Sequence, residues 1–240
     1  MSWLIDRFQD FNEKASIISN DKVYTYKEFF DEVQGFIESF KGKIKKSEVV
    51  AILGDYSFEN IALLLALYQN KNIIVPITST KENEINKRLK EANVDKVIKI
   101  GDKVSIKILP FLKKHQFIQK LQQENKSGLI LFSSGSTGHP KAMIHNFDNL
   151  VDRYKEKKKK KINMLLFLMF DHIGGLNTLL NILSIGATAI IPQNRNADEV
   201  CEIIQNHKIR VLPSSPTFLN LILMNRSYER YDLSALRMIT

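Results

Sequence analysis

The sequence predicts an α/β fold with largely parallel β-sheets flanked by helices. Two observations support this. Short apolar runs rich in β-branched residues recur along the chain, and longer segments with helical spacing of apolar residues separate them. The composition agrees, because 240 residues with 44% hydrophobic and 25% charged side chains describe a globular chain that can bury a sizeable core.

The first half of the chain supplies a regular series of elements from residue 49 onward. Val49–Leu53 predicts a buried strand, and apolar residues at helical spacing predict a helix over 58–69. A charged surface helix is expected at 82–92. Further strands are expected at 73–77, 94–100, 105–109 and 128–132.

The second half continues the alternation. Strands are expected at 164–170 and 187–191 and in the run 210–213, and helices at 176–185 and 197–206. The last residues, Leu236–Thr240, read as the start of another buried strand. A natural domain seldom ends on an unfinished strand, so the chain is expected to be a fragment, truncated inside that strand.

The positive charge is concentrated in one segment. The chain carries 35 Lys+Arg against 26 Asp+Glu, a net charge of +9, and the segment 155–161 contributes six lysines and one glutamate, or +5. Such a run is more often a solvated loop than a binding patch, so no nucleic-acid partner is expected. A patch for RNA or anionic lipid is the alternative, and it rests on this run alone.

The single cysteine and the hydropathy pattern favour a cytoplasmic location without a membrane span. The single Cys201 cannot form an internal disulfide or a cysteine-rich zinc site, which favours a reducing, cytoplasmic setting. The N-terminus has no secretory signal. The uncharged stretch 173–194 is interrupted by glycines, asparagines and Pro192, so buried elements are expected there rather than an integral membrane span.

The segment 133–141, Ser-Ser-Gly-Ser-Thr-Gly-His-Pro-Lys, has the composition of an anion cradle and directly follows the strand at 128–132. Glycines allow successive N–H groups to turn toward one concavity, hydroxyls add donors, and the lysine adds a positive charge. Its spacing differs from that of a Walker loop and of a dinucleotide-binding turn. The residues predicted to bind polyphosphate are Ser133, Ser134, Gly135, Ser136, Thr137, Gly138 and Lys141.

This segment resembles throughout the phosphate-binding signature of the adenylate-forming (AMP-binding) superfamily, which includes acyl-CoA synthetases, peptide-synthetase adenylation domains and luciferases. Four further segments resemble this family in the same order: 24–29, 63–77, 170–175 and 211–219. Among them, Phe170-Asp-His-Ile-Gly-Gly175 is similar to the aromatic-x-histidine-x-x-glycine motif of the acyl-CoA synthetase branch.

The resemblance implies ATP-dependent activation of a carboxylate to an acyl-adenylate, followed by thioester formation with coenzyme A or a phosphopantetheine thiol. It implies ATP and Mg²⁺ as cofactors and a small carboxylic or fatty acid as substrate. The segment 133–141 would hold the β- and γ-phosphates. His172 would gate the acyl site as a catalytic residue; the alternative is a satisfied histidine at a strand end. His145 and Asn146 are expected to cap or pack.

The resemblance also sets an expected domain organisation. Residues 1–240 would form part of an N-terminal AMP-binding domain, without the adenine and ribose motifs and without the C-terminal lid domain and its catalytic lysine. We therefore expect the isolated chain to be inactive or impaired while the parent enzyme is an acid–thiol ligase. The alternative is a non-catalytic remnant, or one half of a split enzyme that depends on a separately encoded C-terminal half. Whether a carrier protein takes part stays open.

Overall fold

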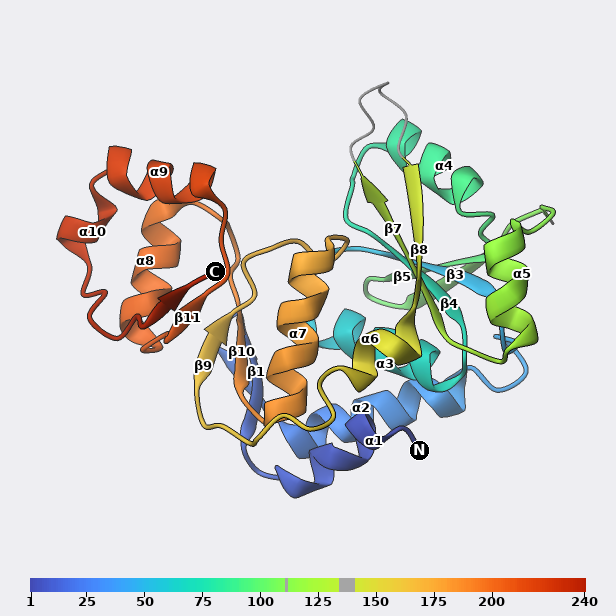
Figure 1. Cartoon of the computed structure of the whole chain (residues 1–240), viewed down its shortest axis with the longest axis horizontal. Helices are drawn as coiled ribbons and strands as arrows, with labels where there is room; N and C mark the ends of the chain where they lie inside the picture. The colour runs from blue at the N-terminus through green and yellow to red at the C-terminus, as the bar shows by residue number, and fades with distance from the viewer. Residues whose placement is uncertain (111, 134–140) are drawn as a thin grey trace.

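The computed structural model describes residues 1–110, 112–133 and 141–240. Two β-sheets dominate this part of the chain, and helices lie between them and on their outer faces (Figure 1). The strand order is β12-β11-β9-β10-β1-β2 in the first sheet and β6-β5-β3-β4-β7-β8 in the second. The alternation of strands and helices expected from the sequence is therefore confirmed.

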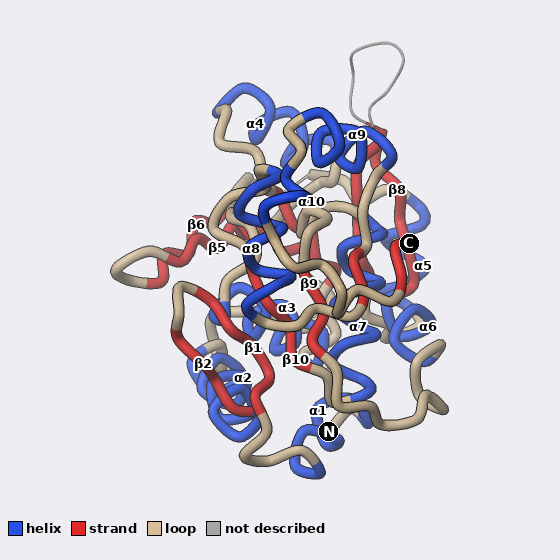
Figure 2. Tube along the Cα trace, turned by 90° about the vertical axis from the view of Figure 1, so that its left-hand side faces the viewer, coloured by secondary structure: helices blue, strands red, loops and turns tan. Residues whose placement is uncertain are grey.

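The first sheet is parallel except at one edge, where β2 runs antiparallel to β1. In Figure 2 the β1–β2 hairpin lies beside α2. The strands are β1 (Ala15–Ser19), β2 (Lys22–Thr25), β9 (Asn163–Leu165), β10 (Thr188–Ile191), β11 (Val211–Leu212) and β12 (Met238–Ile239).

The second sheet has a parallel centre and antiparallel strands at both edges. The prediction of largely parallel sheets is thus confirmed, with antiparallel pairing confined to β2, β6 and β8. The strands are β3 (Val49–Leu53), β4 (Ile73–Ile77), β5 (Lys96–Ile100), β6 (Val104–Ile108), β7 (Gly128–Ser133) and β8 (Lys141–Asn146).

The helices form three layers around these sheets. The middle layer holds α1 (Trp3–Asp6), η1 (Arg7–Asp10), α2 (Tyr26–Ser39), α3 (Phe58–Gln69), α6 (Phe147–Asp152) and α7 (Ile173–Ile185). One outer layer holds α4 (Glu82–Glu91) and α5 (Gln116–Gln123), and the other holds α8 (Ala197–Asn206), α9 (Pro216–Met224) and α10 (Ser227–Arg230).

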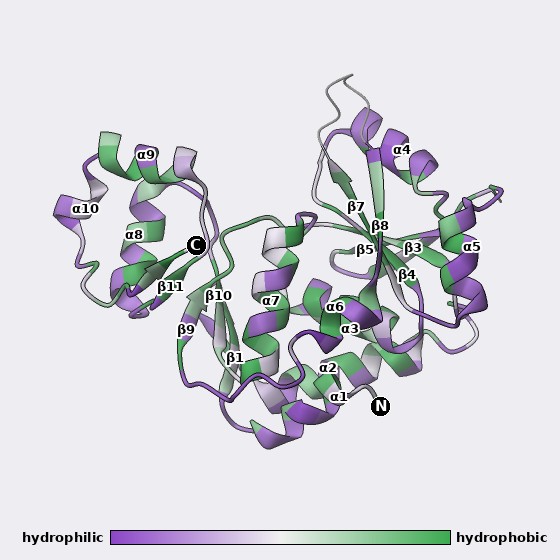
Figure 3. Cartoon of the chain, viewed as in Figure 1, coloured by the Kyte–Doolittle hydropathy of each residue, from purple (hydrophilic) through white to green (hydrophobic). Residues whose placement is uncertain are grey.

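The side-chain pattern of each element follows from its layer. In β3, Val50 and Ile52 face the middle core while Val49 and Ala51 face the outer core, so the whole strand is apolar. Helix α3 lies between the sheets, and its residues 60–68 are all buried. Figure 3 shows α4, on the outside, as mostly hydrophilic.

One strand prediction is wrong over most of its length. The expected strand at 164–170 ends at Leu165 as β9, although residues 166 and 167 are buried. The backbone beyond Leu166 bonds to side chains instead of to a neighbouring strand, because Arg195 donates to the Phe167 carbonyl and Asp55 accepts from the Phe170 N–H. An apolar run therefore became a loop that is buried at residues 166, 167 and 170 and exposed at Met169.

The final segment is a strand, as predicted, but it is not buried. In β12, which pairs parallel with β11, Met238 is 55% exposed and Ile239 is 48% exposed. The sequence prediction also lacked the N-terminal elements up to residue 48. Among them α2 begins at a capping box, in which the Thr25 hydroxyl accepts from the Glu28 N–H and Glu28 accepts from the Thr25 N–H.

No helix in the described ranges is long and apolar enough to cross a membrane. The uncharged stretch from 173 to 194 forms α7 and β10, which are buried against the middle layer.

Candidate functional site

The β7–β8 hairpin carries the two described ends of the segment 133–141. Ser133 ends β7 and Lys141 begins β8, and their Cα atoms are register partners. The Ser133 side chain is half-buried and Lys141 is exposed. Both lie at the carboxyl end of the parallel strands, where ligands bind in α/β sheets. The other predicted phosphate-binding residues lie outside the described residues: Ser134, Gly135, Ser136, Thr137 and Gly138.

An ion pair connects this strand end to the loop before α7. The Arg88 Nη1 of α4 lies 2.7 Å from the Asp171 Oδ2, and this oxygen also accepts from the Thr78 N–H just after β4 (3.2 Å). The Arg88 guanidinium lies over the Phe132 ring in β7, 5.4 Å from its centroid. Arg88 therefore holds Phe132, near the end of β7, close to Asp171, the residue before His172.

A second ion pair joins the carboxyl ends of the two sheets. Asp55 follows β3, and its Oδ2 lies 2.7 Å from the Nη1 of Arg195, which follows β10. The Asp55 Oδ1 accepts from the N–H groups of Tyr56 and Phe170. This carboxylate thus fixes the loop that leads from β9 to α7.

His172 is the N-cap residue of α7. Its Nδ1 accepts a hydrogen bond from the Gly174 N–H (3.1 Å), and its side chain is exposed. The alternative expected from the sequence was a histidine at a strand end with its hydrogen bonds satisfied. His172 does have a hydrogen-bond partner, but it caps the start of a helix. The gating role of His172 stays a prediction.

Close packing explains why position 175, in the histidine motif, is a glycine. A Cβ on Gly175 would lie 2.2 Å from the Met169 carbonyl oxygen and 2.8 Å from the Tyr56 hydroxyl. The first turn of α7 therefore packs against the preceding loop at a distance that only glycine allows. Burial raises the pKa of Tyr56 well above its ordinary value, so its hydroxyl stays neutral.

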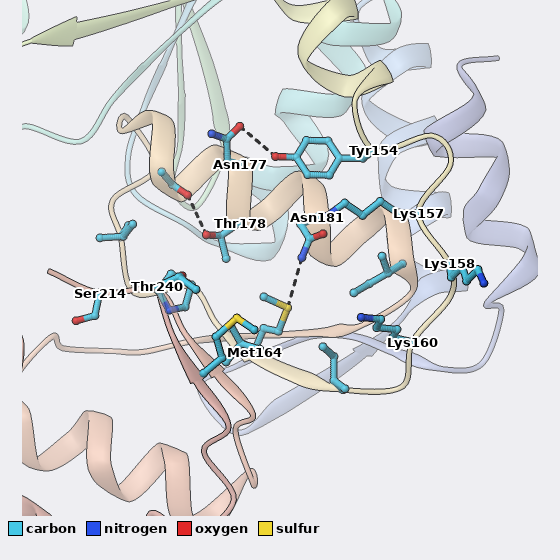
Figure 4. Close-up of a pocket in the computed structure, with 17 residues that line it drawn as sticks. Tyr154, Lys157, Lys158, Lys160, Met164, Asn177, Thr178, Asn181, Ser214 and Thr240 are labelled. Carbon is cyan, nitrogen blue, oxygen red and sulfur yellow. Dashed lines mark hydrogen bonds between the residues drawn. The ribbon is translucent and has the colours of Figure 1, made fainter.

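A cavity of about 780 Å³ lies beside α7 (Figure 4). The helix contributes Gly174, Asn177, Thr178, Asn181 and Ile185, which share one face at intervals of three and four residues. Strands β9, β11 and β12 contribute apolar residues opposite. Sequence reasoning missed this face, although polar residues at helical spacing within an apolar helix were a usable signal.

Hydrogen bonds order the polar residues of the cavity wall. The Tyr154 hydroxyl donates to the Asn177 Oδ1 (3.2 Å), and the Thr178 hydroxyl donates to the Gly174 carbonyl (2.9 Å). The wall is therefore apolar with a few fixed polar groups, as in small-molecule sites.

The residues that follow the segment 133–141 cap and pack, as predicted. The Asn146 Oδ1 accepts from the Asn149 N–H (3.0 Å) and caps α6. The His145 Nε2 is buried without a hydrogen-bond partner among the described residues. Burial, with a smaller contribution from Arg153, lowers the pKa of His145.

The described residues suit a polyphosphate better than they suit a metal ion alone. A hydroxyl at Ser133 and an exposed ammonium at Lys141 are groups that can bind phosphate, and they lie at the carboxyl end of the parallel strands. Within the described ranges, no group of three or more His, Cys, Asp or Glu side chains could hold a metal ion.

A family model described as AMP-binding enzyme matches residues 5–240. The chain belongs to this family. Among curated relatives, 2-succinylbenzoate–CoA ligase of Bacillus pumilus is 23% identical over 92% of this chain and 50% of its own length. Indoleacetate–CoA ligase of Aromatoleum aromaticum is 32% identical over 47% of this chain and 23% of its own. The chain spans about half the length of the curated relatives that match nearly all of it.

Solved structures confirm the fold of this AMP-binding family member. The o-succinylbenzoate CoA synthetase of Bacillus subtilis, in complex with an acyl-adenylate intermediate, superposes with a TM-score of 0.77 at 19% identity, over 99% of this chain and 67% of the other. The N-terminal subdomain of NpsA from Klebsiella oxytoca gives a TM-score of 0.75 at 20% identity, over 92% and 61%. The chain thus has the fold of the N-terminal portion of such enzymes.

Proposed function

We propose that the protein containing this chain activates a small carboxylic or fatty acid with MgATP, forming an acyl-adenylate, and then transfers the acyl group to the thiol of coenzyme A or phosphopantetheine. The observation that carries this proposal is the placement of Ser133 and Lys141. In this AMP-binding family member, both residues lie at the carboxyl end of the parallel strands of a sheet. The relatives named as CoA ligases support it.

The residues would act mainly by electrostatics and positioning. Attack of a carboxylate on a phosphate brings two anions together, so the Lys141 ammonium and the hydroxyls of 133–137 would offset charge on the β- and γ-phosphates. The cavity beside α7 would hold the acyl group, and His172, two residues before the cavity wall begins at Gly174, would lie at its mouth. ATP supplies the adenylyl group, and Mg²⁺ would further neutralise its phosphates.

The domain assignment belongs to the same proposal. Residues 1–240 would be part of an N-terminal AMP-binding domain that supplies the polyphosphate segment and one wall of the acyl cavity. The alternative is a remnant, or a partner-dependent half, that binds nucleotide without turnover. ATP–pyrophosphate exchange by the whole protein that contains this chain discriminates between them, because only an adenylating protein exchanges label.

Binding of MgATP, measured by calorimetry, tests the phosphate site. We expect Lys141→Ala to weaken binding about tenfold or more, since a charge-assisted contact to phosphate is lost. Lys107→Ala is the matched control, because Lys107 is an exposed strand lysine at the opposite edge of the same sheet. Equal effects of the two substitutions, or no binding by a folded chain, would contradict the proposed site.

A further inference from the structure

The cavity beside α7 is apolar along its walls and basic at one end. We propose that it takes a carboxylic acid with a second negative charge at its far end, a dicarboxylic acid, and that Lys157 and Lys160 bind the second carboxylate. This inference rests on the proposed function, which assigns the cavity to the acyl group. It adds the substrate class.

The cavity has two distinct ends, because its wall follows α7. Gly174 lies in the first turn, close to His172, and Ile185 is the last residue of the helix. These residues are about 16 Å apart along the helix axis at 1.5 Å per residue. The main-chain N–H of Lys160 donates to the Ile185 carbonyl (2.8 Å). The lysine segment is therefore attached at the end of the cavity far from His172.

The charges that face the cavity are all of one sign. Its lining includes Lys157, Lys158 and Lys160 but no aspartate or glutamate side chain. Figure 4 shows Lys157 and Lys160 extending toward α7 and the cavity, whereas the Lys158 ammonium points outward. No ion pair to Lys157 or Lys160 occurs among the described residues, and the Lys157 ammonium lies 5.6 Å from the centre of the Tyr154 ring.

Two other lysines of the same segment, Lys155 and Lys159, do not line the cavity. The Lys159 ammonium lies 3.1 Å from the Asp10 carboxylate and over the Phe11 ring, and Lys159 is not part of the cavity lining. Lys155 is exposed and also outside the lining. The segment is thus two-sided, with some lysines directed toward the cavity and others toward solvent or η1.

The electrostatic consequence is selectivity for an anionic far end. Lys157 and Lys160 are exposed, and with no carboxylate among the lining residues they give this end of the cavity a positive charge that attracts an anion. A neutral alkyl end would gain nothing from either ammonium group. The second carboxylate of a dicarboxylic acid supplies a partner for them, while its first carboxylate lies toward His172.

Calorimetry with nonanedioate and nonanoate tests this inference, because the two acids differ only in the second carboxylate. We expect the unmodified chain to bind nonanedioate about tenfold more tightly. Lys157→Gln/Lys160→Gln should reduce this preference to about twofold or less. Lys155→Gln/Lys159→Gln removes the same charge from outside the cavity and should retain the preference. Circular dichroism checks that both variants are folded.

The outcomes separate the inference from the proposed function. If the chain binds both acids equally, or if both double variants change the preference alike, the inference is overturned and the phosphate site is unaffected. If the chain binds MgATP but neither acid, the acyl role of the cavity fails and the inference fails with it. Loss of MgATP binding in Lys141→Ala, measured separately, supports the proposed phosphate site whatever the acids do.

Discussion

At the scale of single residues, His145 makes the stability of the fold depend on pH. It lies in β8, close to the segment 133–141, and burial lowers its pKa below the ordinary value of a histidine. The unfolded chain therefore binds a proton at this position near pH 6.5, while the folded chain resists it. Stability contributed by neutral His145 is present above about pH 6.5 and is lost as the pH falls toward the folded pKa.

His145→Gln tests this, because glutamine cannot titrate. In urea unfolding between about pH 5 and pH 8, we expect the free energy of unfolding to decrease more steeply with falling pH in the unmodified chain than in the variant. At pH 8 the histidine is neutral in both states, so the difference measured there gives the cost of the substitution itself. A pH dependence that is identical in the two proteins would rule out this role.

At the scale of elements, the first turn of α7 depends on close packing at the histidine motif. Gly175→Ala places a methyl group against the Met169 backbone, which cannot move without shifting the loop after β9. We expect a loss of about 1–3 kcal/mol in the free energy of unfolding, as for overpacking. Thermal or urea unfolding measures it.

Gly35→Ala is the matched control for this substitution. Gly35 lies inside α2, and nothing lies within 4 Å of the position its Cβ would take. Alanine should stabilise this helix by up to about 1 kcal/mol. If both substitutions stabilise the chain, the contact between α7 and the loop is looser than described.

At the scale of the whole molecule, the two sheets are held together at their carboxyl ends by Asp55–Arg195 and Arg88–Asp171. Asp55→Ala leaves the Arg195 guanidinium and the N–H groups of Tyr56 and Phe170 without their acceptor. We expect a loss of about 2 kcal/mol in the free energy of unfolding, because one carboxylate serves three donors. Hydrogen exchange at the Phe170 amide should also become faster.

The exposed pair Glu38–Lys41 provides the control. Both side chains are well exposed, so Glu38→Ala should cost less than about 1 kcal/mol. Similar losses in the two variants would mean that Asp55 acts as an ordinary surface charge and does not join the sheets.

Much of the fold could be predicted from local sequence patterns. Strands such as Val49–Leu53 and Ile73–Ile77 and the helix Phe58–Gln69 begin and end where the apolar runs and helical spacing predicted. These elements are buried on both faces, so local sequence and tertiary environment favour the same structure. The resemblance carried by 133–141 and 170–175 also led to the family to which the chain belongs.

Which distant residues come into contact depends on tertiary packing and could not be predicted from local patterns. Asp55 and Arg195 are 140 positions apart in the sequence and form an ion pair. They bond to the backbone of the apolar run 164–170, which is a loop after Leu165 and not the strand that was predicted. The lysine run is an exposed loop, as the sequence predicted, but only the fold places Lys157 and Lys160 beside a cavity formed by α7. Local apolar patterns determine elements because burial acts on each segment, but a site forms where distant segments pack, and no local pattern records that.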